Sequence, residues 1–152
     1  MNLRDAQLEP TLDRPGFAHR HTSVREALSG DPIGCSLYDV DPGNQLWPYH
    51  FHWNNEEWLI VVAGTPTLRT PDGERELRAG DVVGFIEGEA GAHTLVNRSD
   101  ATFRVALFST RNQGAVVYPD SGKVGAGPPW DRLYFKREDA VDYWKGENPS
   151  VS

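Results

Sequence analysis

The sequence contains one cysteine, Cys35, among its 152 residues, so it cannot form an internal disulfide. Its apolar neighbours predict that Cys35 is a small core residue of a half-buried strand. The longest apolar run, 58–63, is too short to cross a bilayer. The first ten residues, MNLRDAQLEP, lack the apolar stretch of a signal peptide. We therefore expect a cytoplasmic protein that does not insert into a membrane.

Basic residues are outnumbered by acidic ones. Lys and Arg total 15 and Asp and Glu total 22, which gives a formal net charge of −7. Proteins that bind nucleic acid need basic surface to meet the phosphate backbone, so the composition disfavours nucleic acid as a partner. It disfavours anionic membranes for the same reason. A small molecule is the expected partner.

Turn-forming residues are abundant, with 15 glycines and 11 prolines. They predict frequent turns and short strands rather than long helices. Between Ile33 and Thr110, short apolar or alternating runs recur with turn signals between them. The runs are 33–40, 57–63, 66–70, 74–78, 81–86, 92–97 and 102–109. This pattern is typical of an all-β fold, an antiparallel β-sandwich or barrel with short flanking helices.

The segments on either side of this barrel are shorter and more polar. Residues 1–32 are expected to form an N-terminal arm. Residues 1–22 read as loosely structured, and the serine and glutamate of Ser23-Val-Arg-Glu26 predict a short helix over 24–29. We take 33–110 as the barrel. The tail, 111–152, is too short to be a second domain.

The tail nevertheless carries apolar residues in numbers that do not suit a free chain end. A strand is expected at Leu133–Phe135 and a short helix at Glu138–Trp144. We therefore expect the tail to pack on the barrel.

The histidines are the candidates for chemistry. His50 and His52 flank one residue, and alternate residues of a strand point to the same face. Glu57 then opens an apolar run, where a carboxylate is costly unless it is paired or binds a metal. His93 follows a glycine-rich turn. Three histidines and one carboxylate suit a first-row transition metal and leave coordination positions for water or substrate.

A second H-x-H pair, His19 and His21, has no carboxylate close behind it. We interpret this pair as a surface feature, which shows that H-x-H alone is a weak signal.

Residues 50–64 resemble the first cupin motif, H-x-H-(x)4-E-(x)6-G, and end at Gly64. Residues 80–97 resemble the second, G-(x)5-P-x-G-…-H-(x)3-N, through Gly80, Gly88, His93 and Asn97. Ile86 stands where the family usually has proline, and the interval from Gly88 to His93 is long, which predicts a bulging loop. The glycine expected before the first histidine is displaced, as Gly43. The tail segments 116–124 and 141–147 are similar to those of small bacterial single-domain cupins of unassigned function.

The resemblance implies a jelly-roll barrel with a metal in its mouth, and often a homodimer. It implies one divalent transition metal per chain (Fe, Mn, Zn or Ni), with His50, His52, Glu57 and His93 as ligands. The family includes isomerases, epimerases, decarboxylases and dioxygenases. We expect a small-molecule enzyme, either a sugar-type isomerase or an iron-dependent dioxygenase. The alternative is a non-catalytic module that binds or senses a small ligand or a metal.

The adjacent glutamates, Glu56 and Glu57, point to opposite faces of an extended strand, so only one of them can be a ligand. Both faces of this strand are apolar, and strand parity does not choose between them. The motif spacing selects Glu57 as the ligand. Glu56 then becomes the candidate catalytic residue, either orienting a histidine or acting as an acid–base group.

Overall fold

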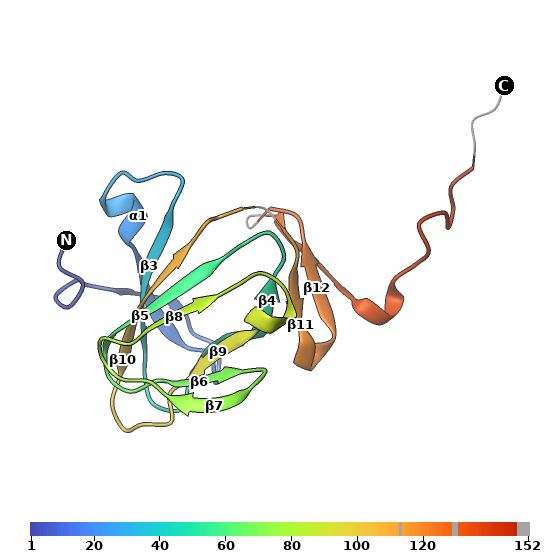
Figure 1. Cartoon of the computed structure of the whole chain (residues 1–152). Coiled ribbons are helices and arrows are strands. Elements are labelled where there is room, and N and C mark those ends of the chain that lie inside the picture. The colour runs from blue at the N-terminus through green and yellow to red at the C-terminus, as the bar shows by residue number, and fades with distance from the viewer. Residues whose placement is uncertain (113, 129–130, 149–152) are drawn as a thin grey trace.

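A computed structural model describes residues 1–112, 114–128 and 131–148. In these ranges, antiparallel strands form a six-stranded and a seven-stranded sheet, and the two sheets pack face to face as one sandwich (Figure 1). The strands are β1 (Glu9–Leu12), β2 (His19–Ser23), β3 (Gly34–Val40), β4 (Gln45–His52), β5 (Glu57–Ala63), β6 (Thr67–Thr70), β7 (Gly73–Glu76), β8 (Val82–Phe85), β9 (His93–Val96), β10 (Phe103–Ser109), β11 (Val116–Tyr118), β12 (Lys123–Ala126) and β13 (Leu133–Lys136). The prediction of an all-β fold, an antiparallel sandwich with short flanking helices, is confirmed.

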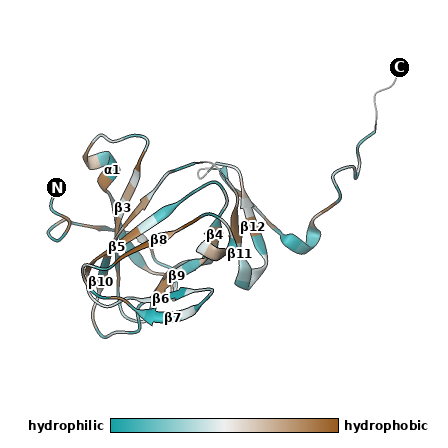
Figure 2. Cartoon of the chain, viewed as in Figure 1, coloured by the Kyte–Doolittle hydropathy of each residue, from teal (hydrophilic) through white to brown (hydrophobic). Residues whose placement is uncertain are grey.

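The six-stranded sheet has the order β1-β2-β3-β10-β5-β8, and the seven-stranded sheet has the order β13-β12-β11-β4-β9-β6-β7. Their facing sides supply the main core. Leu59 and Val61 of β5 meet Leu46 of β4 and Leu95 of β9 there, and all four are almost fully buried. Edge strand β7, by contrast, is exposed and hydrophilic along its length (Figure 2). The two sheets therefore share one hydrophobic interior.

All seven predicted runs coincide with observed strands, within one or two residues at most ends. The prediction of a loosely structured arm over residues 1–22 is wrong. β1 and β2 pair there and extend the six-stranded sheet beyond β3. Their short, polar sequences hide this pairing, because an edge strand needs little apolar surface. The predicted short helix is present as α1 (Val24–Ala27), and the backbone N–H of Glu26 donates to Ser23 Oγ over 3.2 Å.

The N-terminal arm is fixed by Arg104 of β10. Its guanidinium donates to both carboxylate oxygens of Asp39 at 2.7 Å and to the carbonyl oxygens of Leu3, Arg4 and Ala6.

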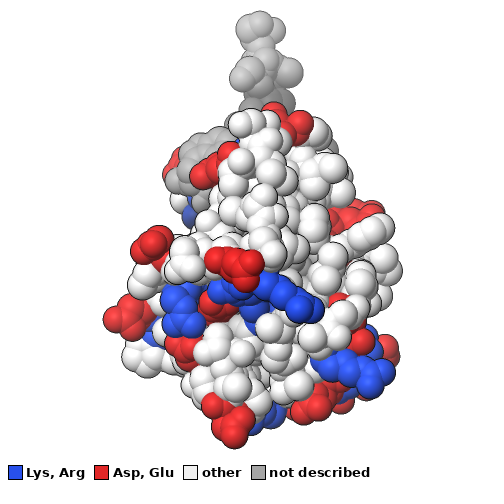
Figure 3. Space-filling model, turned by 90° about the vertical axis from the view of Figure 1, so that its left-hand side faces the viewer, with Lys and Arg blue, Asp and Glu red and all other residues white. Residues whose placement is uncertain are grey.

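On the face shown in Figure 3, Lys and Arg side chains form a short band with Asp and Glu side chains around it. That face therefore offers no continuous positive surface.

The tail docks only in part. Val116 and Val117 of β11 are buried, and β11 pairs with β4. β12 pairs with β11, and β13 pairs with β12 as the edge strand. The side chains of Tyr134 and Phe135 are about half exposed, and the chain beyond β13 runs away from the barrel (Figure 1).

The helix expected over Glu138–Trp144 is not formed. A single 3₁₀ turn, Arg137–Asp139, occupies its start. The described residues of the tail pack no apolar face of such a helix against the barrel, and a short isolated helix is marginal in water. No helix among the described residues has the length and apolar character needed to cross a bilayer.

Candidate metal centre

His50 and His52 reach the interior because β4 carries a bulge. The pairing of β4 with β9 shifts register between Leu46 and His50, and Trp47 has a positive φ of 61°. The hydroxyl of Thr94 donates to the carbonyl oxygens of Leu46 and Trp47, which the bulge has removed from the ladder. After the bulge, strand alternation turns both imidazoles to the inner side.

His93 lies directly across the ladder from His50. The two residues are paired in register, and their ring centroids are 4.8 Å apart. Phe85 stacks on His93 with centroids 3.7 Å apart, which fixes the plane of the imidazole. Three histidines of the seven-stranded sheet therefore converge at one end of the barrel.

Backbone carbonyls set the tautomers of two of these rings. Nδ1 of His50 lies 2.8 Å from the carbonyl oxygen of Pro48, and Nδ1 of His93 lies 2.9 Å from that of Gly91. A carbonyl only accepts, so each Nδ1 carries the proton and donates it. Each Nε2 then keeps a free lone pair, which is the form that binds a metal.

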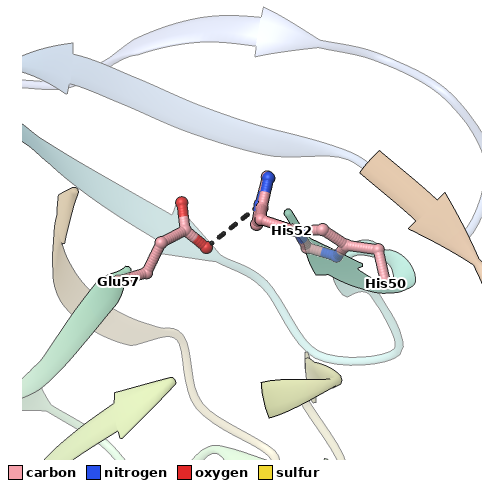
Figure 4. A group of neighbouring side chains, drawn as sticks. All are labelled: His50, His52 and Glu57. Atoms are coloured by element: carbon pink, nitrogen blue, oxygen red, sulfur yellow. Dashed lines mark ion pairs between the residues drawn. The ribbon is translucent and has the colours of Figure 1, made fainter. Parts of the chain in front are cut away.

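Glu57 completes the group from the opposite sheet. Its Oε2 lies 3.3 Å from Nε2 of His52 (Figure 4). The same oxygen lies 3.4 Å from Nε2 of His93. His50, His52 and Glu57 each offer a ligand atom, and these atoms all lie within 4.8 Å of one another. Among the described residues, His52 Nε2 and Glu57 Oε2 are buried atoms without a hydrogen-bond partner. A cation between them would satisfy both, so the residues fit a divalent metal.

The electrostatics of the metal-free chain favour the ligand forms. Burial lowers the pKa of His50 to about 3, with further lowering by His93 and His52, so this imidazole is neutral at pH 7. Burial alone would raise the pKa of Glu57. The imidazoles of His52 and His93, which face the carboxylate, outweigh that effect and hold the pKa of Glu57 below the ordinary value. The carboxylate is therefore ionised.

The structure brings together the four residues predicted as ligands and separates Glu56 from them. The Glu56 side chain is exposed, and its Oε1 accepts a 2.7 Å hydrogen bond from Nε1 of Trp58. Consecutive residues at the start of β5 point to opposite faces, so Glu56 points outward where Glu57 points inward. The predicted role of Glu56 as orienting or acid–base group at this centre has no support in the geometry.

A cavity of about 290 Å³ opens beside Glu57. Its lining comes largely from the six-stranded sheet and α1, and includes His21, Ser23, Arg25, Ser36, Tyr38 and Arg111. The interpretation of the His19 and His21 pair as a surface feature is wrong, because His19 is only 5% exposed and His21 lines this cavity. The alternation in HRHTS was the available signal, since it places His21 and Ser23 on one face.

Tyr118 of β11 is a further neighbour that sequence reasoning did not single out. Its ring stacks on that of His50, with centroids 5.9 Å apart. Burial, followed by interactions with Tyr134, raises the pKa of Tyr118 to about 12. The phenol therefore stays protonated beside the histidines.

The model of the cupin domain family matches residues 36–109, which contain all four converging side chains. The chain contains a cupin domain. This cupin is 25% identical to the nitrile hydratase subunit beta of a Rhodococcus species, over 91% of the chain and 63% of that protein. The chain thus spans less than two thirds of the curated relative.

Solved structures extend the likeness to the whole chain. A proposed sugar phosphate isomerase from Acidithiobacillus ferrooxidans matches with 25% identity and a TM-score of 0.83, over 91% of this chain and 90% of that one. A cupin-superfamily sugar phosphate isomerase from Silicibacter pomeroyi matches with 19% identity and a TM-score of 0.79, over 92% and 94%. The second likeness supports the fold alone.

The remaining residues of the cupin motifs have structural explanations in this cupin. Gly64 has a φ of 78°, and a Cβ there would lie 2.7 Å from Cα of Phe103. The amide of Asn97 donates to the carbonyl oxygens of Val40 and Ala101. The long interval before His93 is taken up by a 3₁₀ turn, Glu89–Gly91, which confirms the predicted bulge.

Proposed function

We propose that this cupin is a divalent-metal-dependent isomerase of a small sugar-type substrate that carries a phosphate or a similar anionic group. The observation that carries the proposal is the cavity. It is walled by a candidate metal ligand, Glu57, and by two guanidinium groups, those of Arg25 and Arg111. A substrate held there would have one end at the metal centre, beside Glu57. Its other end would reach the guanidinium groups of Arg25 and Arg111.

The two arginines suit an anionic end group. Arg25 belongs to α1 and Arg111 follows β10, and their side chains are 28% and 41% exposed. Gly34 leaves room for Arg111, because a Cβ at that position would lie 2.8 Å from its Cγ. Guanidinium groups bind phosphate through two parallel hydrogen bonds, which a lysine cannot reproduce. Arg25 pairs with Glu26 and Arg111 pairs with Asp31, and both carboxylates are exposed. An incoming phosphate can replace these surface ion pairs.

Aldose–ketose isomerisation needs a proton to leave the carbon next to a carbonyl and to return on the neighbouring carbon. The C–H electron pair becomes the double bond of an enediol as the carbonyl oxygen takes up a proton. The reverse steps on the adjacent carbon give the isomer, with no net oxidation. A divalent ion held by the three histidines and Glu57 would polarise the carbonyl when bound. The cavity wall holds the substrate's hydroxyl groups and its anionic end.

The likeness to sugar phosphate isomerases supports this reading, and the polar cavity wall agrees with it. Metal analysis and an activity panel test it. Purified protein is loaded separately with Mn, Zn, Ni and Fe(II), then assayed with five- and six-carbon aldose and ketose phosphates and with the same sugars lacking phosphate. We expect isomerisation of at least one phosphate and weak or no turnover of its neutral counterpart. Oxygen consumption with Fe(II), or tight binding without turnover, would overturn the proposal.

An arginine variant sharpens the assay. Arg111→Gln removes the guanidinium and keeps a polar side chain of similar reach. We expect its KM for the phosphorylated substrate to rise at least tenfold, with little change in metal content. An unchanged KM would remove Arg111 from the binding site.

A further inference from the structure

Three side chains with exchangeable protons form a chain along the cavity wall. His21 of β2 lies opposite Tyr38 of β3 in the ladder, and Ser36 lies two residues before Tyr38. Nε2 of His21 is 3.1 Å from Oγ of Ser36. Tyr38 lies on the same face of β3 as Ser36, and Ser36 lowers the pKa of the Tyr38 phenol against the larger effect of burial. The serine hydroxyl can donate to one neighbour while accepting from the other, so it links the imidazole to the phenol.

The surroundings hold this chain in place. The rings of His21 and Tyr38 have centroids 5.0 Å apart, and the ring of Tyr38 also makes edge contacts with His19 and Trp47. All three members of the chain line the cavity that Glu57 also lines. These three side chains therefore line the same cavity as the candidate ligand Glu57, and none of them is itself a candidate ligand.

The charge states suit proton transfer. Burial lowers the pKa of His21, helped by His19 and opposed by Glu26, so the imidazole is neutral at pH 7 and can accept a proton. Burial raises the pKa of Tyr38, and the charge of Glu57 raises it further, so the phenol keeps its proton and can donate it. A base and an acid joined through one hydroxyl are what enolisation requires.

We propose that His21, Ser36 and Tyr38 form the acid–base relay of this cavity, an inference that rests on the proposed isomerase function. The free ring nitrogen of His21 takes the proton from the carbon next to the carbonyl, and Tyr38 gives its proton to the carbonyl oxygen. Ser36 returns a proton to Tyr38 and receives one from Nε2 of His21. The relay ends neutral with its histidine tautomer exchanged, and the reverse transfers on the adjacent carbon and oxygen restore it.

Variants of the relay test the catalytic role. In the metal-loaded enzyme, His21→Gln, Ser36→Ala and Tyr38→Phe should each lower kcat about a hundredfold or more, the usual range for lost acid–base catalysis. KM and metal content should change less than threefold. Ser36→Thr keeps the hydroxyl and should recover most of the rate lost in Ser36→Ala. Equal kcat in wild type and His21→Gln would overturn the relay.

A second measurement does not depend on turnover. The ring nitrogens of His21 are followed by NMR during a pH titration of the metal-loaded protein labelled with ¹⁵N-histidine. We expect the pKa of His21 to lie below the ordinary histidine value. This pKa should change in both Tyr38→Phe and Ser36→Ala. Titration like a free histidine, unmoved by either change, would overturn the relay. Inactivity of the wild type across the sugar phosphates would instead defeat the proposed function.

Discussion

Oε2 of Glu57 lies 3.3 Å from Nε2 of His52, although the two residues come from different sheets of the barrel. The same oxygen lies 3.4 Å from Nε2 of His93. The centre is therefore a junction between the sheets. A cation bound there would tie their ends together, so metal occupancy and stability should be linked.

We expect one metal per chain, held through His52 among others. His52→Ala removes one bond and leaves Glu57 with one histidine fewer, so metal affinity should fall more than tenfold. The matched control is His21→Ala, which lies in the same cavity but outside the converging group. Metal is measured by elemental analysis after dialysis against a weak chelator. Equal loss of metal from both variants would return the ligand role to the His19 and His21 pair.

The metal should also stabilise the wild type. A ligand at about a hundred times its Kd adds roughly 2.7 kcal/mol to the free energy of unfolding. His52→Ala should show little of this gain. Thermal unfolding with and without metal measures it.

The two adjacent glutamates should behave differently. Glu57→Gln keeps the shape of the side chain but removes the charge at the junction, so it should weaken metal binding sharply. Glu56→Gln should leave metal binding unchanged, because its carboxylate contacts Trp58 on the outside of the barrel. Isothermal titration with a single divalent metal compares them. Weak binding by the Glu56 variant alone would mean that the assignment of the ligand is reversed.

The convergence of three candidate ligands was predictable because the first motif places them in one short interval. His50, His52 and Glu57 lie within eight residues, and strand alternation with a short turn brings them together. His93 required the ladder between β4 and β9, which only the family resemblance implied. The orientation of Glu56 was not predictable, because its contact with Trp58 on the outside of the barrel depends on the turn before β5.

The cavity wall was beyond sequence reasoning. His21 and Tyr38 lie seventeen positions apart in the sequence, and they meet only because β2 pairs with β3. β2 is short and polar, so only the alternation in HRHTS indicated a strand there, and the sequence did not indicate its pairing with β3. Arg25 and Arg111 meet the cavity from segments at opposite ends of the barrel sequence.

Acid should destabilise the metal-free protein. The pKa of His50 is about 3 in the folded chain and 6.5 as an ordinary histidine, so between these values the unfolded chain binds more protons. The free energy of unfolding then falls as pH falls, by at most about 1.4 kcal/mol per pH unit for one group. The lowered pKa values of His19 and His21 act in the same direction. The lowered pKa of Glu57 adds a further loss below pH 4.5.

Urea unfolding of chelator-treated protein at several pH values between 7 and 4 measures this dependence. The midpoint should fall steadily below pH 6.5. A midpoint that stays constant from pH 6.5 to 5 would show that the buried histidines are not held neutral.

Asn97 should contribute to stability rather than to chemistry. It is 1% exposed, donates to Val40 and Ala101, and accepts from the backbone and hydroxyl of Ser99. Asn97→Ala removes this donor from the carbonyl oxygen of the buried residue Val40, at a cost of about 1–3 kcal/mol. Metal affinity per folded molecule should not change. Chemical denaturation and metal titration of the same variant check both statements, and a neutral effect on unfolding would contradict the first.

The exposed apolar tail leads us to expect a homodimer. Tyr143 and Trp144 are 81% and 71% exposed, and Leu133 of β13 is 68% exposed. Covering a large apolar side chain contributes about 1.5–3 kcal/mol, so this surface favours association with a second copy. Light scattering should give twice the 17.0 kDa of one chain. A chain ending at Lys136 keeps every described strand and the metal centre, and it should be a monomer that still binds metal. A monomeric full-length chain would remove the dimer, and a truncated chain that stays dimeric would place the interface within residues 1–136.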